Sequence, residues 1–261
     1  MYAFDFERPA TLADAVKAMA DEDALALSGG QTLIPSLKQR LAMPSKLVSL
    51  TGIDEIKGIC VDDDGRVCIG AATIHADVAA QEHYPALAAL ASNVGDPAVR
   101  NRGTIGGSLA NNDPSACYPA AALGSGAVIR TDKREIAADD YFTGMFETAL
   151  EEGEIITEIK FPVPEKAAYM KFEQPASRFA LVGVFVAKYA DGVRVAVTGA
   201  SNEGVFRWSE AEAALGSDFS AGALDGLKLD GSNMISDVHG SGDYRAHIAA
   251  VMTKRAVQKA G

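Results

Sequence analysis

The sequence predicts an α+β fold, and two features of its pattern favour this class. Short apolar segments typical of strands are interspersed with amphipathic segments, without the sustained strand–helix–strand alternation of a doubly wound sheet. Two turn sequences, Asp62-Asp63-Asp64-Gly65 and Asp191-Gly192, lie between apolar runs and indicate antiparallel hairpins. The 261 residues are 48% hydrophobic and 23% charged, an ordinary globular composition that needs no disulfides to fold.

Residues 1–53 are expected to form a small N-terminal unit. Thr11 precedes apolar residues at helical spacing, so it is expected to cap a helix. Strands are expected at 24–27 and 46–50. A second helix is expected at 33–41 between them, because a proline is tolerated in a first helical turn.

Residues 54–164 are expected to form a second α+β unit that ends at Pro162 and Pro164. Its expected strands are 56–61, 66–70, 127–130 and 155–161, and its expected helices are 74–80, 85–91 and 114–123. The stretch 93–113, rich in glycine and asparagine, is expected to be a loop.

Residues 165–261 are expected to form a C-terminal unit with an antiparallel sheet. Strands at 181–189 and 193–198 are joined by the Asp-Gly turn, and helices are expected at 208–215 and 244–259. The single tryptophan, Trp208, is expected to pack within this unit.

The charge balance excludes several partners. Lysine plus arginine is 24 and aspartate plus glutamate is 35, which gives a net charge of −11, so nucleic acid and anionic membrane surfaces are not expected ligands. No apolar run is long enough for a membrane span, and no secretory leader is apparent. Cys60, Cys68 and Cys117 are widely spaced and form no disulfide framework or metal motif. A cytoplasmic protein with reduced thiols is therefore expected.

Two glycine segments are the candidate site. In Ser28-Gly29-Gly30-Gln31-Thr32, a predicted strand runs through two glycines into a helix, an arrangement that offers backbone N–H groups to an anion. The alternative is an ordinary tight turn. The segment is neither a Walker nor a Rossmann motif, because the lysine of the former and the glycine spacing of the latter are absent.

The second segment runs from Arg100 to Pro114 and contains three glycines, two hydroxyl residues and two arginines within 12 residues. Such a density suits a dinucleotide that is surrounded by backbone donors, although a solvated surface loop is the alternative. Arg100 and Arg102 suit two roles equally, a phosphate clamp and a brace for the loop.

Together the two segments resemble those of a known family. Ser28-Gly29-Gly30-Gln31-Thr32-Leu33-Ile34-Pro35 and Arg100-Asn101-Arg102-Gly103-Thr104-Ile105-Gly106-Gly107-Ser108 are similar to the paired segments in FAD-binding subunits of molybdenum hydroxylases. The resemblance spans nearly the whole chain and is strongest to medium subunits of the aerobic carbon monoxide dehydrogenase type and to xanthine dehydrogenase flavin domains. It implies a two-part FAD-binding domain of the PCMH, or vanillyl-alcohol-oxidase-like, type, followed by a smaller α+β domain.

By that resemblance, FAD is the cofactor and both glycine segments hold its pyrophosphate. The implied cofactor-binding residues are Ser28, Gly29, Gly30, Gln31, Thr32, Thr104, Ile105, Gly106, Gly107, Ser108, Asn111, Cys117, Ile156 and Lys171. Asn111 is implied to lie near the ribityl or ring portion, and Ile156 to be an apolar contact of the flavin. Cys117 stands where the family often has an aspartate, which places the tuning of the flavin and the choice of acceptor in question.

The resemblance also implies a role and partners. A molybdopterin-binding large subunit would oxidise the substrate, and a 2Fe-2S small subunit would pass electrons singly. This chain would collect two electrons on FAD and deliver them to an external acceptor such as a quinone or NAD. Two alternatives stay open: a self-contained flavin oxidoreductase, and a non-catalytic nucleotide-binding assembly protein of the same fold.

Other polar residues are not expected to carry chemistry. His75, His83, His239 and His247 are isolated in sequence and are expected to be structural or solvated. Neither serine of the glycine segments lies in a nucleophile elbow, so hydrolase chemistry is not expected. No metal-ligating group is expected, and the chemistry would belong to the flavin.

Overall fold

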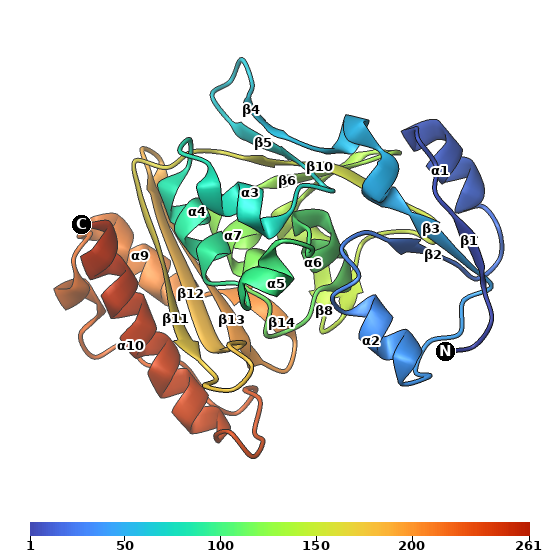
Figure 1. Ribbon diagram of the computed structural model, residues 1–261. Helices are drawn as coiled ribbons and strands as arrows, with labels where there is room; N and C mark the ends of the chain where they lie inside the picture. Colours follow the sequence, from blue (N-terminus) through green and yellow to red (C-terminus); the bar gives the residue numbers. More distant parts are fainter.

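The computed structural model describes all residues from Met1 to Gly261 and contains four β-sheets (Figure 1). The first sheet consists of β1 (Asp5–Glu7), β3 (Lys46–Ser49) and β2 (Ala24–Leu27), in that order, and all three strands are parallel. Helix α1 (Leu12–Ala18) connects β1 to β2, and α2 (Leu33–Lys38) connects β2 to β3. As predicted, Thr11 caps α1, since its hydroxyl accepts the N–H of Asp14 at 3.2 Å.

The second sheet is antiparallel and amphipathic. It consists, in spatial order, of β4 (Ile59–Val61), β5 (Val67–Gly70), β10 (Ile156–Phe161), β6 (Val128–Thr131) and β7 (Glu135–Ala137). Ile69, Ile129 and Ile159 share one face and are wholly buried. Arg130 and Glu158 share the opposite face, where they form an ion pair 3.9 Å long. The alternation follows from the period of two in a strand.

A layer of short helices covers the apolar face of the second sheet. These are α3 (His75–Ala80), α4 (Pro85–Ser92), α5 (Pro97–Arg100), α6 (Ile105–Asn111), α7 (Tyr118–Ser125) and α8 (Ala138–Tyr141). Every residue of α7 is buried, because the helix lies between the second sheet and the C-terminal sheet (Figure 1). The small residues of its alanine-rich sequence permit this close packing on both sides.

The C-terminal sheet is antiparallel and is covered on both faces. It consists of β11 (Lys166–Glu173), β12 (Ala180–Tyr189), β13 (Gly192–Ser201) and β14 (Gly204–Arg207), followed by α9 (Ser209–Ser217) and α10 (Gly242–Ala260). Phe185 of β12 packs in the core that contains α7, whereas Val184 packs in the core that contains α10. The long helix α10 crosses the outer face of the sheet (Figure 1). Trp208 is buried in the core that contains α10, as predicted.

The predicted α+β class is confirmed, but one expectation about local structure is wrong. The stretch 93–113 is not a loop, because it contains α5 and α6. Asp96 caps α5 by accepting the N–H of Val99 at 2.9 Å, and Thr104 caps α6 by accepting the N–H of Gly107 at 3.2 Å. These caps offset the low helix propensity of the glycines.

Other differences concern short strands. The expected strand at 56–61 is reduced to β4, because a 3₁₀ turn occupies Asp54–Ile56. Strands β1, β7, β11 and β14 were not expected, nor was the small sheet of β8 (Phe142–Gly144) and β9 (Glu147–Thr148). Their sequences lack a clear alternation, and long-range pairing stabilises them instead.

We predict that Ile69→Ala will lower the free energy of unfolding by about 2–5 kcal/mol, because the side chain is wholly buried in the second sheet. Val61→Ala on the adjacent strand should cost less than about 1 kcal/mol, since Val61 is 46% exposed. Urea denaturation of the two variants measures both values. Equal destabilisation would show that the apolar face has been misassigned.

Candidate functional site

One cavity of about 710 Å³ lies where the first sheet, the helical layer and the C-terminal sheet meet. This volume is within the range of sites for small molecules and cofactors. Thirteen of the fourteen residues implicated by the sequence line the cavity: Ser28, Gly29, Gly30, Gln31, Thr32, Thr104, Gly106, Gly107, Ser108, Asn111, Cys117, Ile156 and Lys171. The exception is Ile105, whose side chain is wholly buried in the central core.

The two glycine segments are in direct contact. A hydrogen-bonded relay joins them, because the N–H of Gly107 donates to Thr104 Oγ1 (3.2 Å) and that hydroxyl donates to Ser28 Oγ (2.9 Å). A Cβ atom at Gly29 would overlap the carbonyl oxygen of Arg102 and lie 2.6 Å from the Cα of Gly103. Only glycine therefore permits this approach of one backbone to the other.

The first segment presents the unpaired backbone donors. No N–H group from Gly29 to Leu33 donates to an acceptor in the protein; the N–H of Ile34 is the first to do so, to the carbonyl of Gly30 at 3.1 Å. Gly30 has a φ of +70°, a left-handed conformation that turns the chain from β2 into α2. Consecutive unpaired N–H groups around such a turn form a concave site for an anion.

The second segment differs from expectation. Its first two helical N–H groups are already bonded, Ile105 to the carbonyl of Thr73 (3.1 Å) and Gly106 to that of Ala71 (2.9 Å). The N–H of Gly107 is bonded to the Thr104 hydroxyl. The expectation that both segments offer backbone donors is therefore wrong for the start of α6. Backbone pairing with the 71–73 segment has used these donors.

The second segment contributes two glycines, which allow close packing, and polar side chains to the cavity. Gly106 is buried, and its Cβ would lie 2.6 Å from that of Ala71. Gly107, by contrast, is exposed towards the cavity. Ser108 and Asn111 follow on the same helix, and their side chains have no hydrogen-bonding partner in the protein. These groups are suited to sugar hydroxyls or ring edges.

Three further residues form the wall near the C-terminal sheet. Cys117 is 5% exposed, and Ile156 is also 5% exposed at the start of β10. Lys171 of β11 donates from Nζ to the carbonyl of Asn93 at 2.9 Å, so it connects the C-terminal sheet to the helical layer. The cavity therefore has an apolar wall with one ammonium group at its edge.

The segment before Cys117 is held by the C-terminal sheet. The carbonyl of Pro114 accepts the N–H of Gly199 at 2.7 Å and the hydroxyl of Thr198 at 2.9 Å. The N–H of Ala180 donates to the carbonyl of Ser115 at 3.4 Å. One wall of the cavity is thus positioned by residues 65 to 85 positions later in sequence, a relation that only the tertiary fold reveals.

His75 lies at the cavity, where the sequence had indicated only an isolated histidine. It is 5% exposed and packs 5.2 Å from the ring of Tyr118, and its Nδ1 atom has no hydrogen-bonding partner. Burial, with a smaller contribution in the same direction from the charge of Arg100, lowers its pKa to about 4. The imidazole is therefore neutral at pH 7. No local sequence signal identifies it, because its burial is produced by α3 packing against the second glycine segment.

The structure assigns a structural role to Arg100. Its guanidinium donates to the carbonyls of Val94 and Gly95 at 3.2 and 3.0 Å, so it braces the turn before α5. Arg102 contributes its backbone carbonyl to the contact with Gly29, and its side chain is exposed. The two roles left open by the sequence are thereby resolved in favour of the brace for Arg100.

Two of the three cysteines are neighbours across the β4–β5 hairpin. Cys60 and Cys68 are directly opposite one another on β4 and β5, on the face of the second sheet away from the core. Burial, together with smaller contributions from the carboxylates of Glu158 and Asp62, raises the pKa of Cys68 to about 12. The thiol is therefore protonated at neutral pH.

None of the helices combines the length and the apolar composition that a membrane span requires.

The residues present fit a dinucleotide. The unpaired N–H groups of the first segment suit a diphosphate, while hydroxyl and amide side chains and an apolar wall continue the same cavity. Gly29 and Gly106 let the chain segments around the cavity pack closely, because a Cβ at either position would overlap a neighbouring residue. An arrangement of this kind can bind and orient a ligand.

Comparisons with known proteins show to which family the chain is similar. Residues 2–164 match the family described as the FAD binding domain in molybdopterin dehydrogenase. The chain is 34% identical to the carbon monoxide dehydrogenase medium chain of Afipia carboxidovorans, over 99% of this chain and 96% of the relative. It is 32% identical to the nicotine 6-hydroxylase medium subunit of Paenarthrobacter nicotinovorans, over 99% and 98%. A reconstituted CO dehydrogenase from Oligotropha carboxidovorans superposes with a TM-score of 0.89 at 32% identity, over 99% of this chain and 98% of that one.

We predict that Gly29→Ala will destabilise the protein by about 1–3 kcal/mol, because the added Cβ must separate the two glycine segments. Gly216→Ala in α9 is the matched control, since its Cβ meets nothing within 4 Å and alanine favours a helix. Thermal unfolding should therefore shift in opposite directions for the two variants. A neutral Gly29→Ala would contradict the close backbone contact.

We also predict a pH dependence from His75. Below pH 6.5 the unfolded chain binds a proton at His75 that the folded chain excludes. Protonation of His75 therefore does not affect the free energy of unfolding above about pH 6.5, and it lowers this free energy as the pH falls from 6.5 towards 4. The loss of unfolding free energy between pH 7 and 5 should be smaller in His75→Gln by about 2 kcal/mol. His83→Gln, at an exposed histidine, should retain the wild-type slope in urea denaturation. Identical slopes for all three proteins would refute the assignment.

Proposed function

The chain belongs to the family of FAD-binding domains of molybdopterin dehydrogenases, and from that premise we propose that the cavity between the two glycine segments holds its FAD. The predicted resemblance is confirmed, and FAD is the cofactor of the family. The residue assignments are our proposal. The observation that carries them is the convergence of the segment 28–32 with Thr104 and Gly107 on one cavity.

The proposed diphosphate position is at the first segment. The N–H groups of residues 29–32 are unpaired, and the φ of Gly30 curves them around a concave turn. This local positive potential opposes the repulsion that a chain of net charge −11 exerts on a diphosphate. Gly107 would lie beside the same group, because it is the exposed glycine of the second segment.

The remaining assigned residues would bind the rest of the cofactor. Ser108 and Asn111 are one turn apart on α6 and offer unpartnered polar groups to the sugar-alcohol portion. Ile156 and Cys117 would pack against the ring, and Lys171 would lie at its edge. Bound FAD supplies a group that accepts and releases electrons singly or in pairs. The chain itself binds this group, orients it and limits its access to water.

We propose that the chain acts as the electron-transfer subunit of a molybdenum hydroxylase. Support comes from relatives named as medium chains or subunits, which this chain matches over nearly their full length. In this proposal, a molybdopterin-binding large subunit and a 2Fe-2S small subunit are the partners, and an external acceptor takes the electrons. The named relatives differ in substrate, carbon monoxide in one case and nicotine in another.

Two further expectations remain proposals. We propose that the complex is cytoplasmic, which is consistent with three cysteines that are all present as thiols. We also propose the division into units 1–53, 54–164 and 165–261. In its support, each of the three larger sheets takes its strands from one of these stretches.

We predict that the purified chain, incubated with FAD, will retain the visible absorption bands of bound flavin. Gly107→Val should weaken FAD binding by about tenfold or more, because its methyl groups would enter the space between Thr104 and Ser28. Gly216→Val provides the control, since it places the same residue in a helix away from the cavity. Titration of flavin fluorescence gives the dissociation constants. Absence of flavin from the wild-type chain would contradict the proposed function.

A further inference from the structure

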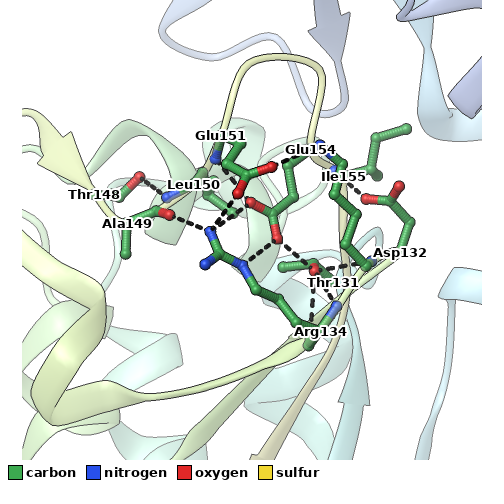
Figure 2. Close-up of polar contacts among 10 residues, drawn as sticks. Thr131, Asp132, Arg134, Thr148, Ala149, Leu150, Glu151, Glu154 and Ile155 are labelled. Atoms are coloured by element: carbon green, nitrogen blue, oxygen red, sulfur yellow. Dashed lines mark hydrogen bonds and ion pairs between the residues drawn. The ribbon is translucent and has the colours of Figure 1, made fainter.

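A second polar cluster borders the cavity. It is formed by residues of the stretch 131–155 (Figure 2), of which Glu154 and Ile155 line the cavity. Its centre is the carboxylate of Glu154, whose side chain is 0% exposed. Leu150, Ile155 and Ile156 line the cavity together with Glu154. The cluster was not singled out by the sequence and has no place in the assignments above.

The carboxylate has a full set of donors. Arg134 binds it in a bidentate manner, from Nε to Oε1 at 3.1 Å and from Nη2 to Oε2 at 3.0 Å. The Thr131 hydroxyl donates to Oε1 at 2.7 Å, and the N–H of Glu151 donates to Oε2 at 2.7 Å. Burial alone would raise the pKa of Glu154, but these bonds and the guanidinium charge outweigh it and lower the pKa to about 2. The group is therefore an anion at neutral pH.

This ion pair fixes a segment rather than two side chains. Nη2 of Arg134 also donates to the carbonyl of Ala149 at 2.7 Å, so the guanidinium spans the segment from 149 to 154. Asp132 continues the attachment, because its N–H donates to the carbonyl of Ile155 at 3.0 Å and its Oδ1 accepts the N–H of Ile155 at 2.7 Å. Figure 2 shows these contacts converging from the two chain segments.

The segment so held is the junction of two cores. Ile155 packs in the apolar core of the N-terminal region together with Met19, whereas the next residue, Ile156, packs in the core that contains α7. Gly153 has a φ of +72°, and its Cβ would lie 3.1 Å from the carbonyl oxygen of Met19. Small movements of this segment would thus shift the apolar wall of the cavity relative to the first glycine segment.

A role in stability alone is a weak explanation for such an ion pair. The pair joins a carboxylate with 0% exposure to a guanidinium that is 42% exposed. Such a pair contributes little net stability, because the carboxylate loses its hydration and water screens the guanidinium. It does, however, define one geometry, since the bidentate pair and two further donors leave the carboxylate a single orientation. Because the ion pair lies beside the cavity wall, its fixed geometry also fixes the position of that wall.

We propose that Glu154 is a positioning residue for the bound cofactor. Through its hydrogen bonds with Arg134 and Thr131, Glu154 holds Ile155 and Ile156 against the cofactor. This inference rests on the proposed function. Glu154 does not touch the reacting atoms. It sets the distance between the apolar wall and the ligand, and thereby the affinity and the spectrum of the flavin.

The test is Glu154→Gln in the full chain, which keeps the shape but replaces an acceptor oxygen with an NH₂ group. Because Arg134 donates to both oxygens, this NH₂ group must face an Arg134 donor in either orientation. We expect the dissociation constant for FAD to rise about tenfold, as for the loss of one charge-assisted hydrogen bond. We also expect the visible absorption of the flavin-saturated variant to differ from wild type, well below the unfolding temperature.

Glu151→Gln is the matched control, because it makes the same charge change 3.8 Å from Arg134 on a side chain that is 60% exposed. It should leave both affinity and spectrum unchanged. If Glu154→Gln lowers only the unfolding temperature of the apoprotein and keeps the wild-type affinity and spectrum, the residue is merely structural and the proposal is wrong.

Arg134→Lys serves if Glu154→Gln does not fold, since lysine retains the charge and loses the bidentate geometry. Raised dissociation constants and an altered spectrum would support the proposal, and wild-type values would overturn it. A wild-type chain that binds no FAD would instead refute the proposed function, so the two failures are distinguishable.

Discussion

The direct contact of two backbone turns is the constraint on which the rest of the site depends. Gly29 lies against the carbonyl of Arg102 and the Cα of Gly103, with no side chain between them. Because these turns come from the first sheet and from the helical layer, their contact fixes how the two parts of the molecule meet. The Thr104–Ser28 hydrogen bond secures the same junction. The cavity is the space that this close approach leaves beside it.

The walls of the cavity are held in place in several different ways. The first segment keeps its backbone donors available, whereas the start of α6 is paired internally and serves as a rigid wall. The buried carboxylate of Glu154 holds the 149–155 segment, and the C-terminal sheet holds the segment that contains Pro114. Binding residues that are already ordered lose little conformational entropy when a ligand arrives.

The sequence was informative where the signal was local. The cap at Thr11 and the hairpin turns depend on residues adjacent in the chain, and the structure has them as predicted. Both glycine segments line one cavity, but only the first has the unpaired backbone N–H groups that were expected of both. The caps at Asp96 and Thr104 were equally local, yet the density of glycine and asparagine concealed α5 and α6. The burial of His75 and the cluster around Glu154 arise from residues far apart in the chain, so no local pattern reveals them.

The attachment of Pro114 to β13 couples the cavity to the stability of the C-terminal sheet. Because its carbonyl is bonded by Gly199 and Thr198, any local opening of that strand releases a wall of the cavity, and a molecule bound there must oppose such opening to the same degree. Ligand occupancy and hydrogen-exchange protection of the C-terminal third are consequently linked quantities. A truncated chain ending near residue 164 would retain both glycine segments and still lack one side of the pocket.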